Sequence, residues 1–167
     1  MFSVGDKIVY PMHGAGIVHN IQEKEVDGQI LTYYVLTIPI GSLTVTISNK
    51  KADDLGIRYA KTQEEIQEIL DCFNKMPQGI PDDWNKKYES NLEKMKTGEL
   101  SQALEVYLSL YSREGVKGLS GIEKRLLSVA KQVILSELIV SQDIDKAVAE
   151  KTLRNIVAKF ETAILNL

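Results

Sequence analysis

The chain of 167 residues contains few of the side chains that metal sites and disulfides need, with one cysteine and two histidines. The single cysteine, Cys72, cannot form an internal disulfide, so we expect the reducing environment of the cytoplasm. The spacing of Cys72 from His13 and His19 matches no structural zinc pattern. Surface or turn positions are the better interpretation of both histidines. We therefore expect no metal and no other cofactor.

Long hydrophobic runs are also absent. No apolar stretch approaches the roughly 20 residues that a membrane-spanning helix needs. The start of the chain, MFSVGDKIVY, lacks the basic and then apolar pattern of a secretory signal peptide. Hydrophobic content of 44% and charged content of 26% are ordinary for a soluble globular protein. We expect a cytoplasmic protein with no membrane contact.

The chain has no excess of the positive charge that nucleic-acid-binding proteins commonly carry. Its net charge is -3. Residues 1–76 carry all of the excess negative charge, while residues 77–167 have 13 basic and 13 acidic side chains. A surface that binds nucleic acid would therefore be a local patch in the second part of the chain, where helices can sort charges onto faces.

Catalytic motifs are missing as well. The sequence contains no G-x-S-x-G, no H-E-x-x-H and no P-loop pattern. Gly14-Ala15-Gly16 is similar to a phosphate loop, but a predicted strand follows it rather than a helix, so a tight turn is the better interpretation. We do not expect an enzyme, because a small enzyme would need a polar pocket that the sequence does not indicate.

The first 60 residues have the pattern of short β-strands. The runs DKIVY, IVHNI, LTYYVLTI and LTVTI are rich in β-branched and aromatic residues with alternating apolar positions. Turn signals separate them: PMHGAG follows the first run, and Asp27-Gly28 lies between the second and the third. A short fifth strand is predicted at residues 57–59. Strands at this spacing predict a small β-barrel.

From Thr62 onward the apolar residues recur with the period of a helix. Thr62 with Glu65 predicts a capping box at the first helix, and Ser120 with Glu123 predicts another further along the chain. The run MPQGIP predicts a boundary between helices. Helices are predicted over 63–73, 83–97, 99–115, 120–140 and 144–165. Their short connections predict a compact helical bundle.

These two periods predict an α+β protein, with a small N-terminal β-barrel followed by a C-terminal all-α helical bundle. We expect residues 1–60 to form the β domain, 61–80 a helix and linker, and 81–167 a helical domain. The expected state is a monomer. A barrel with long connections can also exchange strands between copies, so a domain-swapped dimer is the alternative.

The only tryptophan, Trp84, lies in PDDWNKKY, where a helix is predicted to begin. A lone tryptophan in a helical bundle is more often buried than exposed. Its place in a first turn, after Asp82 or Asp83 as N-cap, favours the other interpretation, an apolar side chain kept at the surface. Lys86 and Lys87 project nearby. Both interpretations stay open on this pattern alone.

Other basic residues follow along the predicted helices. Lys94 shares the helix of Trp84, and GLSGIEKRLLSVAKQ contributes Lys124, Arg125 and Lys131. Lys124 and Lys131 are seven residues apart, so they share a face of the helix. A solvated face with acidic partners at i,i+4 is the common alternative to nucleic-acid binding.

Four stretches together resemble the CarD/CdnL family of bacterial transcription regulators. They are VGDKIVYPMHGAGIV, GSLTVTI, DDWNKKYESNLEKMKTG and GLSGIEKRLLSVAKQVILSEL. The resemblance covers about residues 2–155. The first stretch is also similar to a domain of transcription-repair coupling factors that docks on RNA polymerase, whereas the tryptophan and GLSGIEKR segments are typical of CarD-like regulators.

The resemblance implies a Tudor-like (SH3-like) barrel that binds the β subunit of RNA polymerase. It also implies a helical domain that contacts promoter DNA at the upstream edge of the transcription bubble. A tryptophan at the position of Trp84 is implied to wedge into the minor groove there and to slow collapse of the bubble. The basic residues expected to contact DNA are Lys86, Lys87, Lys94, Lys124, Arg125 and Lys131.

GSLTVTI resembles the family's polymerase-facing strand. An exposed strand edge can add to a sheet of its partner. The alternative is an internal strand of the barrel whose apolar side chains point inward. The residues expected to contact polymerase are Lys24, Leu43, Thr44, Val45, Thr46 and Ile47. Thr46 stands where family members often carry arginine, a departure that bears on the strength of this contact.

We hypothesise a non-enzymatic transcription regulator that binds the polymerase β subunit and stabilises open promoter complexes. A protein held on polymerase has a high local concentration near the DNA, so a net charge of -3 is compatible with DNA contact. The alternative is a protein–protein adaptor of the transcription or repair machinery with no direct DNA role. In that case Trp84 would be a core or interface anchor.

Overall fold

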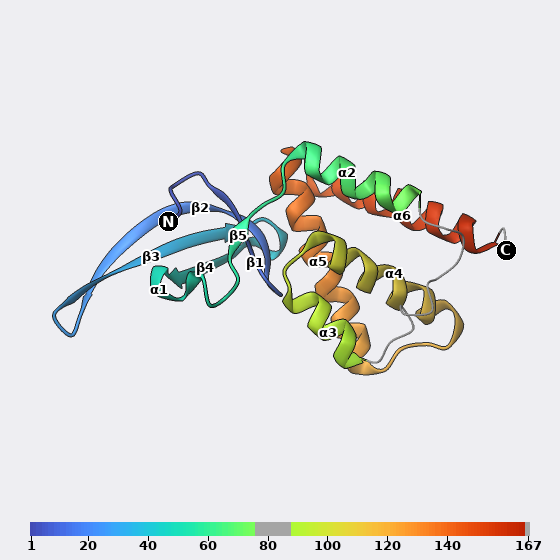
Figure 1. The fold of residues 1–167 in the computed structure, drawn as a ribbon, viewed down its shortest axis with the longest axis horizontal. Helices are drawn as coiled ribbons and strands as arrows, with labels where there is room; N and C mark the ends of the chain where they lie inside the picture. The colour runs from blue at the N-terminus through green and yellow to red at the C-terminus, as the bar shows by residue number, and fades with distance from the viewer. Residues whose placement is uncertain (76–87, 166–167) are drawn as a thin grey trace.

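The computed structural model describes residues 1–75 and 88–165. A β half is followed by a helical half along an elongated molecule (Figure 1). The strands are β1 (Lys7–Tyr10), β2 (Gly14–Val26), β3 (Gln29–Ile38), β4 (Leu43–Ser48) and β5 (Arg58–Tyr59). The helices are η1 (Ile40–Ser42), α1 (Asn49–Ala52), α2 (Gln63–Asn74), α3 (Tyr88–Lys96), α4 (Leu100–Val116), α5 (Gly121–Gln142) and α6 (Lys146–Leu165). The predicted α+β class is confirmed.

The strands form one antiparallel sheet with the order β4-β3-β2-β1-β5. The hairpin predicted at Asp27-Gly28 is confirmed, since both residues have positive φ, 50° and 77°, as a tight two-residue turn requires. The β2–β3 hairpin extends beyond the other strands (Figure 1). β4 is an edge strand, and no other strand of the described residues pairs with its outer side.

The interpretation of Gly14-Ala15-Gly16 as a tight turn is wrong. The turn comes earlier, at residues 11–13, and residues 14–16 already belong to β2 and pair with β1. Close packing explains the glycines. A Cβ atom at Gly16 would lie 2.3 Å from the carbonyl oxygen of Thr37, and one at Gly14 would lie 2.7 Å from Ser136 Oγ. The glycines therefore let segments distant in sequence approach one another.

The capping box predicted for α2 is confirmed. The Thr62 N–H donates to the Glu65 carboxylate at 2.7 Å, and the Glu65 N–H donates to Thr62 Oγ1 at 3.2 Å. The hydrogen bond from the Thr62 backbone lowers the pKa of the Glu65 carboxyl. At the start of α5, Ser120 Oγ accepts the Glu123 N–H at 3.3 Å, but the Glu123 carboxylate lies 3.4 Å from Arg113 of α4. The Glu123 carboxylate therefore pairs with Arg113 instead of completing the predicted capping box with Ser120.

The remaining helices follow the predicted periods. α4, α5 and α6 correspond to the predicted helices over 99–115, 120–140 and 144–165. The helix predicted over 83–97 is described from Tyr88 as α3, while its start and the MPQGIP boundary lie outside the described residues. None of the helices in the described part of the chain is both long and apolar enough for a membrane span.

Each half has its own hydrophobic core. The core of the β half is built from residues such as Ile8, Val18, Leu36 and Ile47, and all four are at most 2% exposed. The core of the helical half lies around α4 and α5, with α2, α3 and α6 against it (Figure 1).

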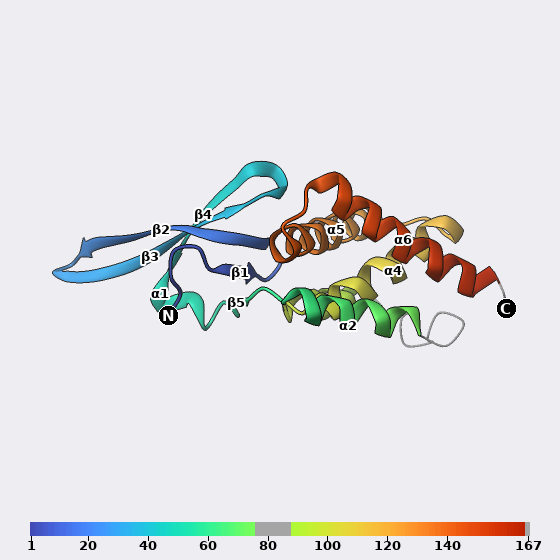
Figure 2. The same cartoon turned by 90° about the horizontal axis from the view of Figure 1, so that it is seen from above.

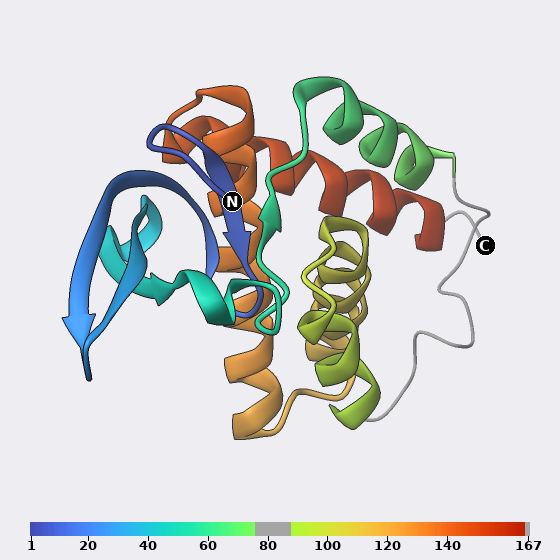
Figure 3. The same ribbon diagram turned by 60° about the vertical axis from the view of Figure 1, so that its left-hand side comes forward.

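The two halves meet where the C-terminal part of α5 packs on β1 and β2 (Figures 2 and 3). Val9, Ala15 and Val140 form a small apolar cluster there. The Ala15 N–H donates to Ser136 Oγ at 2.8 Å, and a Cβ at Gly98 would lie 2.8 Å from the Pro11 ring. Because α5 also belongs to the helical core, this close fit connects the sheet to that core through α5.

Candidate functional site

β4 is both a core strand and a free edge, which combines the two alternatives left open by its sequence. Ile47 is 2% exposed and points into the core of the β half, and Val45 is partly buried against the same core. Leu43 is 45% exposed, and Thr44 and Thr46 are exposed. The strand therefore offers polar main-chain groups, two threonines and one leucine to a partner.

Lys24 lies on the projecting part of the β2–β3 hairpin and is exposed. Its Nζ is 5.3 Å from the ring centroid of Tyr33, a cation–π distance. Tyr33 pairs with Ser48 at the C-terminal end of β4. The structure thus brings Lys24 next to the end of β4, although the two are about twenty residues apart in the sequence.

The basic residues predicted on α5 lie in its first half. Lys124, Arg125 and Lys131 are all exposed, and no ion pair of any of them is found within residues 1–75 and 88–165. Lys124 and Lys131 are about 10 Å apart along the helix axis, because each residue of a helix adds 1.5 Å. Lys131 also lines a hollow with Glu150 and Glu161, so Lys124 and Arg125 are the cations of this helix best placed to attract phosphate groups.

Lys94 has a different environment from the basic residues of α5. Its Nζ is 3.0 Å from the Glu105 carboxylate of α4, and the side chains of Lys94 and Glu105 are 18% and 24% exposed. The ion pair largely neutralises the charge of Lys94. We expect Lys94 to attract phosphate less strongly than the exposed lysines do.

Trp84, Lys86 and Lys87 lie outside the described residues. The helix that follows them is anchored, since Tyr88 and Leu92 of α3 pack on the core of the helical half. The roles of all three stay predictions from the sequence.

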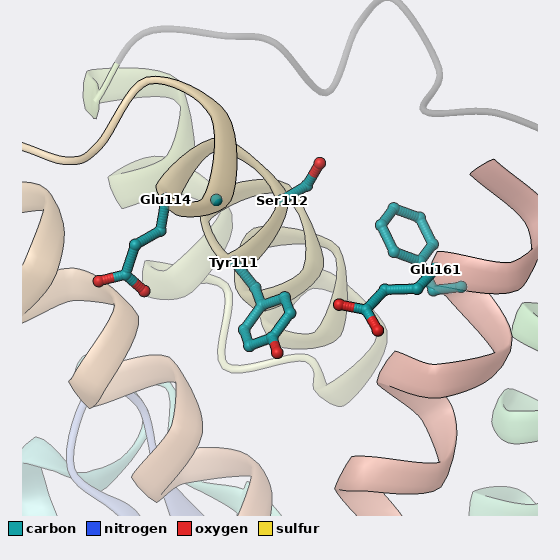
Figure 4. Close-up of a pocket in the computed structure, with 6 residues that line it drawn as sticks. Tyr111, Ser112, Glu114 and Glu161 are labelled. Carbon is teal, nitrogen blue, oxygen red and sulfur yellow. The ribbon is translucent and has the colours of Figure 1, made fainter. Parts of the chain in front are cut away.

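A hollow of about 330 Å³ lies between the end of α4 and α6 (Figure 4). Tyr111 and Glu161 point toward one another across it, and Glu114 lies on the other side of Tyr111. Burial and the neighbouring Tyr111 and Glu114 raise the pKa of the Tyr107 hydroxyl nearby. The two carboxylates would repel phosphate, so this end of the helical half is a poor surface for DNA.

The histidines and the cysteine are not gathered into one site. His13 Nδ1 is 3.0 Å from the carbonyl oxygen of Pro11, His19 is exposed on β2, and Cys72 is exposed on α2. Within the described residues, no group of three or more histidine, cysteine, aspartate or glutamate side chains is placed to hold a metal ion.

A buried ion pair that the sequence patterns did not predict joins the two halves, Arg58 of β5 with Glu137 of α5. A signal for it exists in the apolar run VILSELIV, which contains Glu137 as its only charged residue. A glutamate on a buried helix face needs a partner. The sequence does not indicate which cation, because Arg58 is 79 residues away.

Comparison with known proteins agrees with this two-part architecture. A CarD-like/TRCF RID domain model matches residues 2–60, and a CarD C-terminal domain model matches residues 68–154. The Bacillus subtilis (strain 168) protein named "Putative transcription factor YdeB" is 34% identical over 155 residues, which cover 93% of this chain and 99% of that protein. These are families of transcription regulators rather than of enzymes. The chain therefore belongs to the CarD family and has a role in transcription that involves RNA polymerase.

Proposed function

We propose that this protein binds the β subunit of RNA polymerase through the β4 edge and stabilises open promoter complexes with its helical half. The observation that carries the proposal is the presence of a free strand edge and an exposed basic helix in one connected molecule. The edge suits a protein partner, and the basic helix suits a phosphate backbone.

The β4 edge supports docking by strand addition. Unpaired N–H and C=O groups of an edge strand can extend the sheet of a partner, and exposed side chains then give specificity. Leu43 is the large apolar side chain that β4 exposes, at 45%. It supplies an apolar anchor beside the polar main chain, and Lys24 supplies a charge at the other end of the strand.

The helical half supplies the DNA contacts of the proposal. Trp84 inserts between base steps at the upstream edge of the bubble, and the exposed cations hold the flanking phosphates. Unstacking a base step costs on the order of a few kcal/mol. Polymerase has already distorted the DNA at that edge, so much of the unstacking cost is absent. Tethering to polymerase raises the local concentration of the protein at the DNA, so binding does not need a strong overall positive charge.

Replacing Leu43 with lysine should weaken binding to the isolated β subunit by about tenfold or more, because hot-spot side chains of an interface contribute about 2 kcal/mol or more each. Biolayer interferometry with immobilised β subunit measures the dissociation constant. The matched control is Val148→Lys on α6, since Val148 is 47% exposed and lies in the other half. Equal affinities for the two variants would contradict docking at β4.

Replacing Lys86 or Lys87 with alanine should weaken the DNA contact in all promoter sequences and lower the salt slope by about one for each lost phosphate contact. Crosslinking of the polymerase-bound protein to promoter DNA, titrated with potassium chloride, measures the slope. Lys151→Ala on α6 is the control, because Lys151 is an exposed lysine outside the proposed site. An unchanged slope would remove Lys86 and Lys87 from the site and favour an adaptor without a DNA role.

A further inference from the structure

Arg58 forms an unusually complete set of hydrogen bonds for a residue in a two-residue strand. Its Nη1 and Nη2 donate to the two carboxylate oxygens of Glu137 at 2.9 and 3.0 Å. Its Nε and Nη2 also donate to the carbonyl oxygen of Gly98, at 3.0 and 2.6 Å, and Nη1 donates to the carbonyl oxygen of Tyr59. All five N–H groups of the guanidinium therefore have acceptors.

Glu137 is the centre of this junction on the helical side. Its side chain is 1% exposed, and its Oε1 also accepts the Lys61 N–H at 2.9 Å. One turn further along α5, the hydroxyl of Ser141 donates to the carbonyl oxygen of Lys61. The network thus joins β5, the segment after it, the turn before α4 and the C-terminal part of α5.

This network restrains direction as well as distance. A bidentate guanidinium–carboxylate pair has a fixed planar geometry, unlike an apolar contact, which tolerates sliding and rotation. Other ion pairs cross the same junction: Lys7 with Asp143 at 3.4 Å, Lys61 with Glu99 at 3.2 Å and Arg58 with Glu99 at 3.8 Å. Asp143 is 79% and Glu99 is 44% exposed, and ion pairs with exposed partners contribute little to stability. The orientation of the two halves therefore depends mainly on Arg58 and Glu137 together with the close packing around them.

α5 converts a small rotation at this junction into a displacement of its basic residues. Arg125 lies twelve residues before Glu137, which is about 18 Å along the helix. A tilt of about 10° at Glu137 would move Arg125 by about 3 Å, which exceeds the tolerance of a hydrogen bond to phosphate. DNA contact by α5 thus requires a fixed angle between α5 and the sheet.

We propose that Arg58 and Glu137 are positioning residues that fix the orientation of the DNA-contacting helices relative to the sheet docked on polymerase. This inference rests on the proposed function. With the pair intact, docking of the sheet places the basic face of α5 at the DNA. Without it, the tethered helical half spends only a fraction of the time in the competent orientation, and its effective concentration at the DNA falls by that fraction.

The orientation is measured first on the free protein, without polymerase or DNA. The single native Cys72 on α2 is exposed, so one added cysteine, Asp54→Cys after α1, gives a pair of sites for spin labels across the junction. Pulsed electron paramagnetic resonance should give one narrow distance distribution in the native background. Glu137→Gln should broaden it at least about twofold, while Asp143→Asn, which removes the exposed pair and tolerates the φ of 51°, should leave it unchanged.

The same variants are then compared on polymerase. Glu137→Gln should bind the β subunit with native affinity and yet lose most of the extension of open-complex lifetime, whereas Asp143→Asn should keep both. A folded Glu137→Gln protein with a narrow distance distribution would overturn the positioning role. A broad distribution with native open-complex lifetimes would overturn the coupling of orientation to function.

A double variant covers the case in which Glu137→Gln does not fold. Arg58→Met/Glu137→Met replaces the pair by apolar side chains of similar volume, a change that buried ion pairs often tolerate. It should fold, show a broad distance distribution and fail to extend open-complex lifetime. Native values for both measurements would overturn the inference. If the native protein does not extend open-complex lifetime, the proposed function fails instead, and the distances in the free protein still decide the role of the pair in orientation.

Discussion

Replacing Trp84 with alanine should leave the affinity for the β subunit unchanged and shorten the lifetime of open promoter complexes by about tenfold, or to the value without the protein. An aromatic ring stacked on a base contributes about 1–3 kcal/mol, and 1.4 kcal/mol corresponds to a factor of ten in rate. In the proposed function the sheet carries the polymerase contact, so this part of binding should be independent of the ring. Competitor challenge of preformed open complexes, followed by a fluorescent base in the bubble, measures the lifetime.

Tyr111→Ala is the matched control for Trp84→Ala. Tyr111 is an aromatic side chain of the helical half that is 36% exposed, and it lines one hollow with Glu114 and Glu161 and a neighbouring hollow with Lys131 and Glu150. Its loss should not change open-complex lifetime. A native lifetime with Trp84→Ala would refute the wedge and favour a role of Trp84 in the core or in a protein interface.

Replacing Gly16 with alanine should destabilise the protein by about 2–3 kcal/mol, which corresponds to a thermal midpoint roughly 5–10 °C lower. The added methyl group would lie 2.3 Å from the carbonyl oxygen of Thr37 and 2.9 Å from Leu36 Cδ1. The first of these atoms belongs to the backbone of β3, so strands β2 and β3 must move apart. Thermal unfolding followed by circular dichroism measures the change.

Gly115→Ala separates this packing effect from the general effect of replacing glycine. Gly115 lies in α4, and a Cβ there would have no heavy atom within 4 Å. Alanine should stabilise the helix by about 0.4–1 kcal/mol, because glycine is the poorer helix former. Equal stability of the Gly16→Ala and native proteins would contradict the close approach of β2 and β3.

Local sequence signals predicted most of the elements of this fold. The alternating runs gave strands, Asp27-Gly28 gave the hairpin turn, and Thr62 with Glu65 gave the start of α2. Each signal acts over a few residues, where backbone propensity and side-chain period decide the structure. Glu123 shows the limit, because its carboxylate contacts Arg113 of another helix instead of completing the second capping box.

The features that depend on distant segments could not be predicted in the same way. The local pattern around the glycines of β2 predicts a turn, because the close neighbours that explain them, Thr37 and Ser136, are distant in the sequence. The edge position of β4 depends on the strand order of the whole sheet. The pairing of Lys94 with Glu105 depends on how α3 packs against α4. Only the tertiary structure brings these partners together.

The candidate site was predicted as a set of residue types but not as an arrangement. The structure brings Lys24 to the end of β4 and leaves Lys124, Arg125 and Lys131 exposed on one helix. It pairs Lys94 with an acidic neighbour. It also adds the connection between the two surfaces, in which α5 joins the sheet at Glu137 and carries the exposed cations at its other end.

The decisive measurement of open-complex stabilisation is the open-promoter lifetime as native protein is titrated into polymerase. If the docked protein stabilises open complexes, the lifetime rises with protein concentration and reaches a plateau at the concentration that saturates the β subunit. A lifetime that stays constant while the β subunit becomes fully occupied would contradict it.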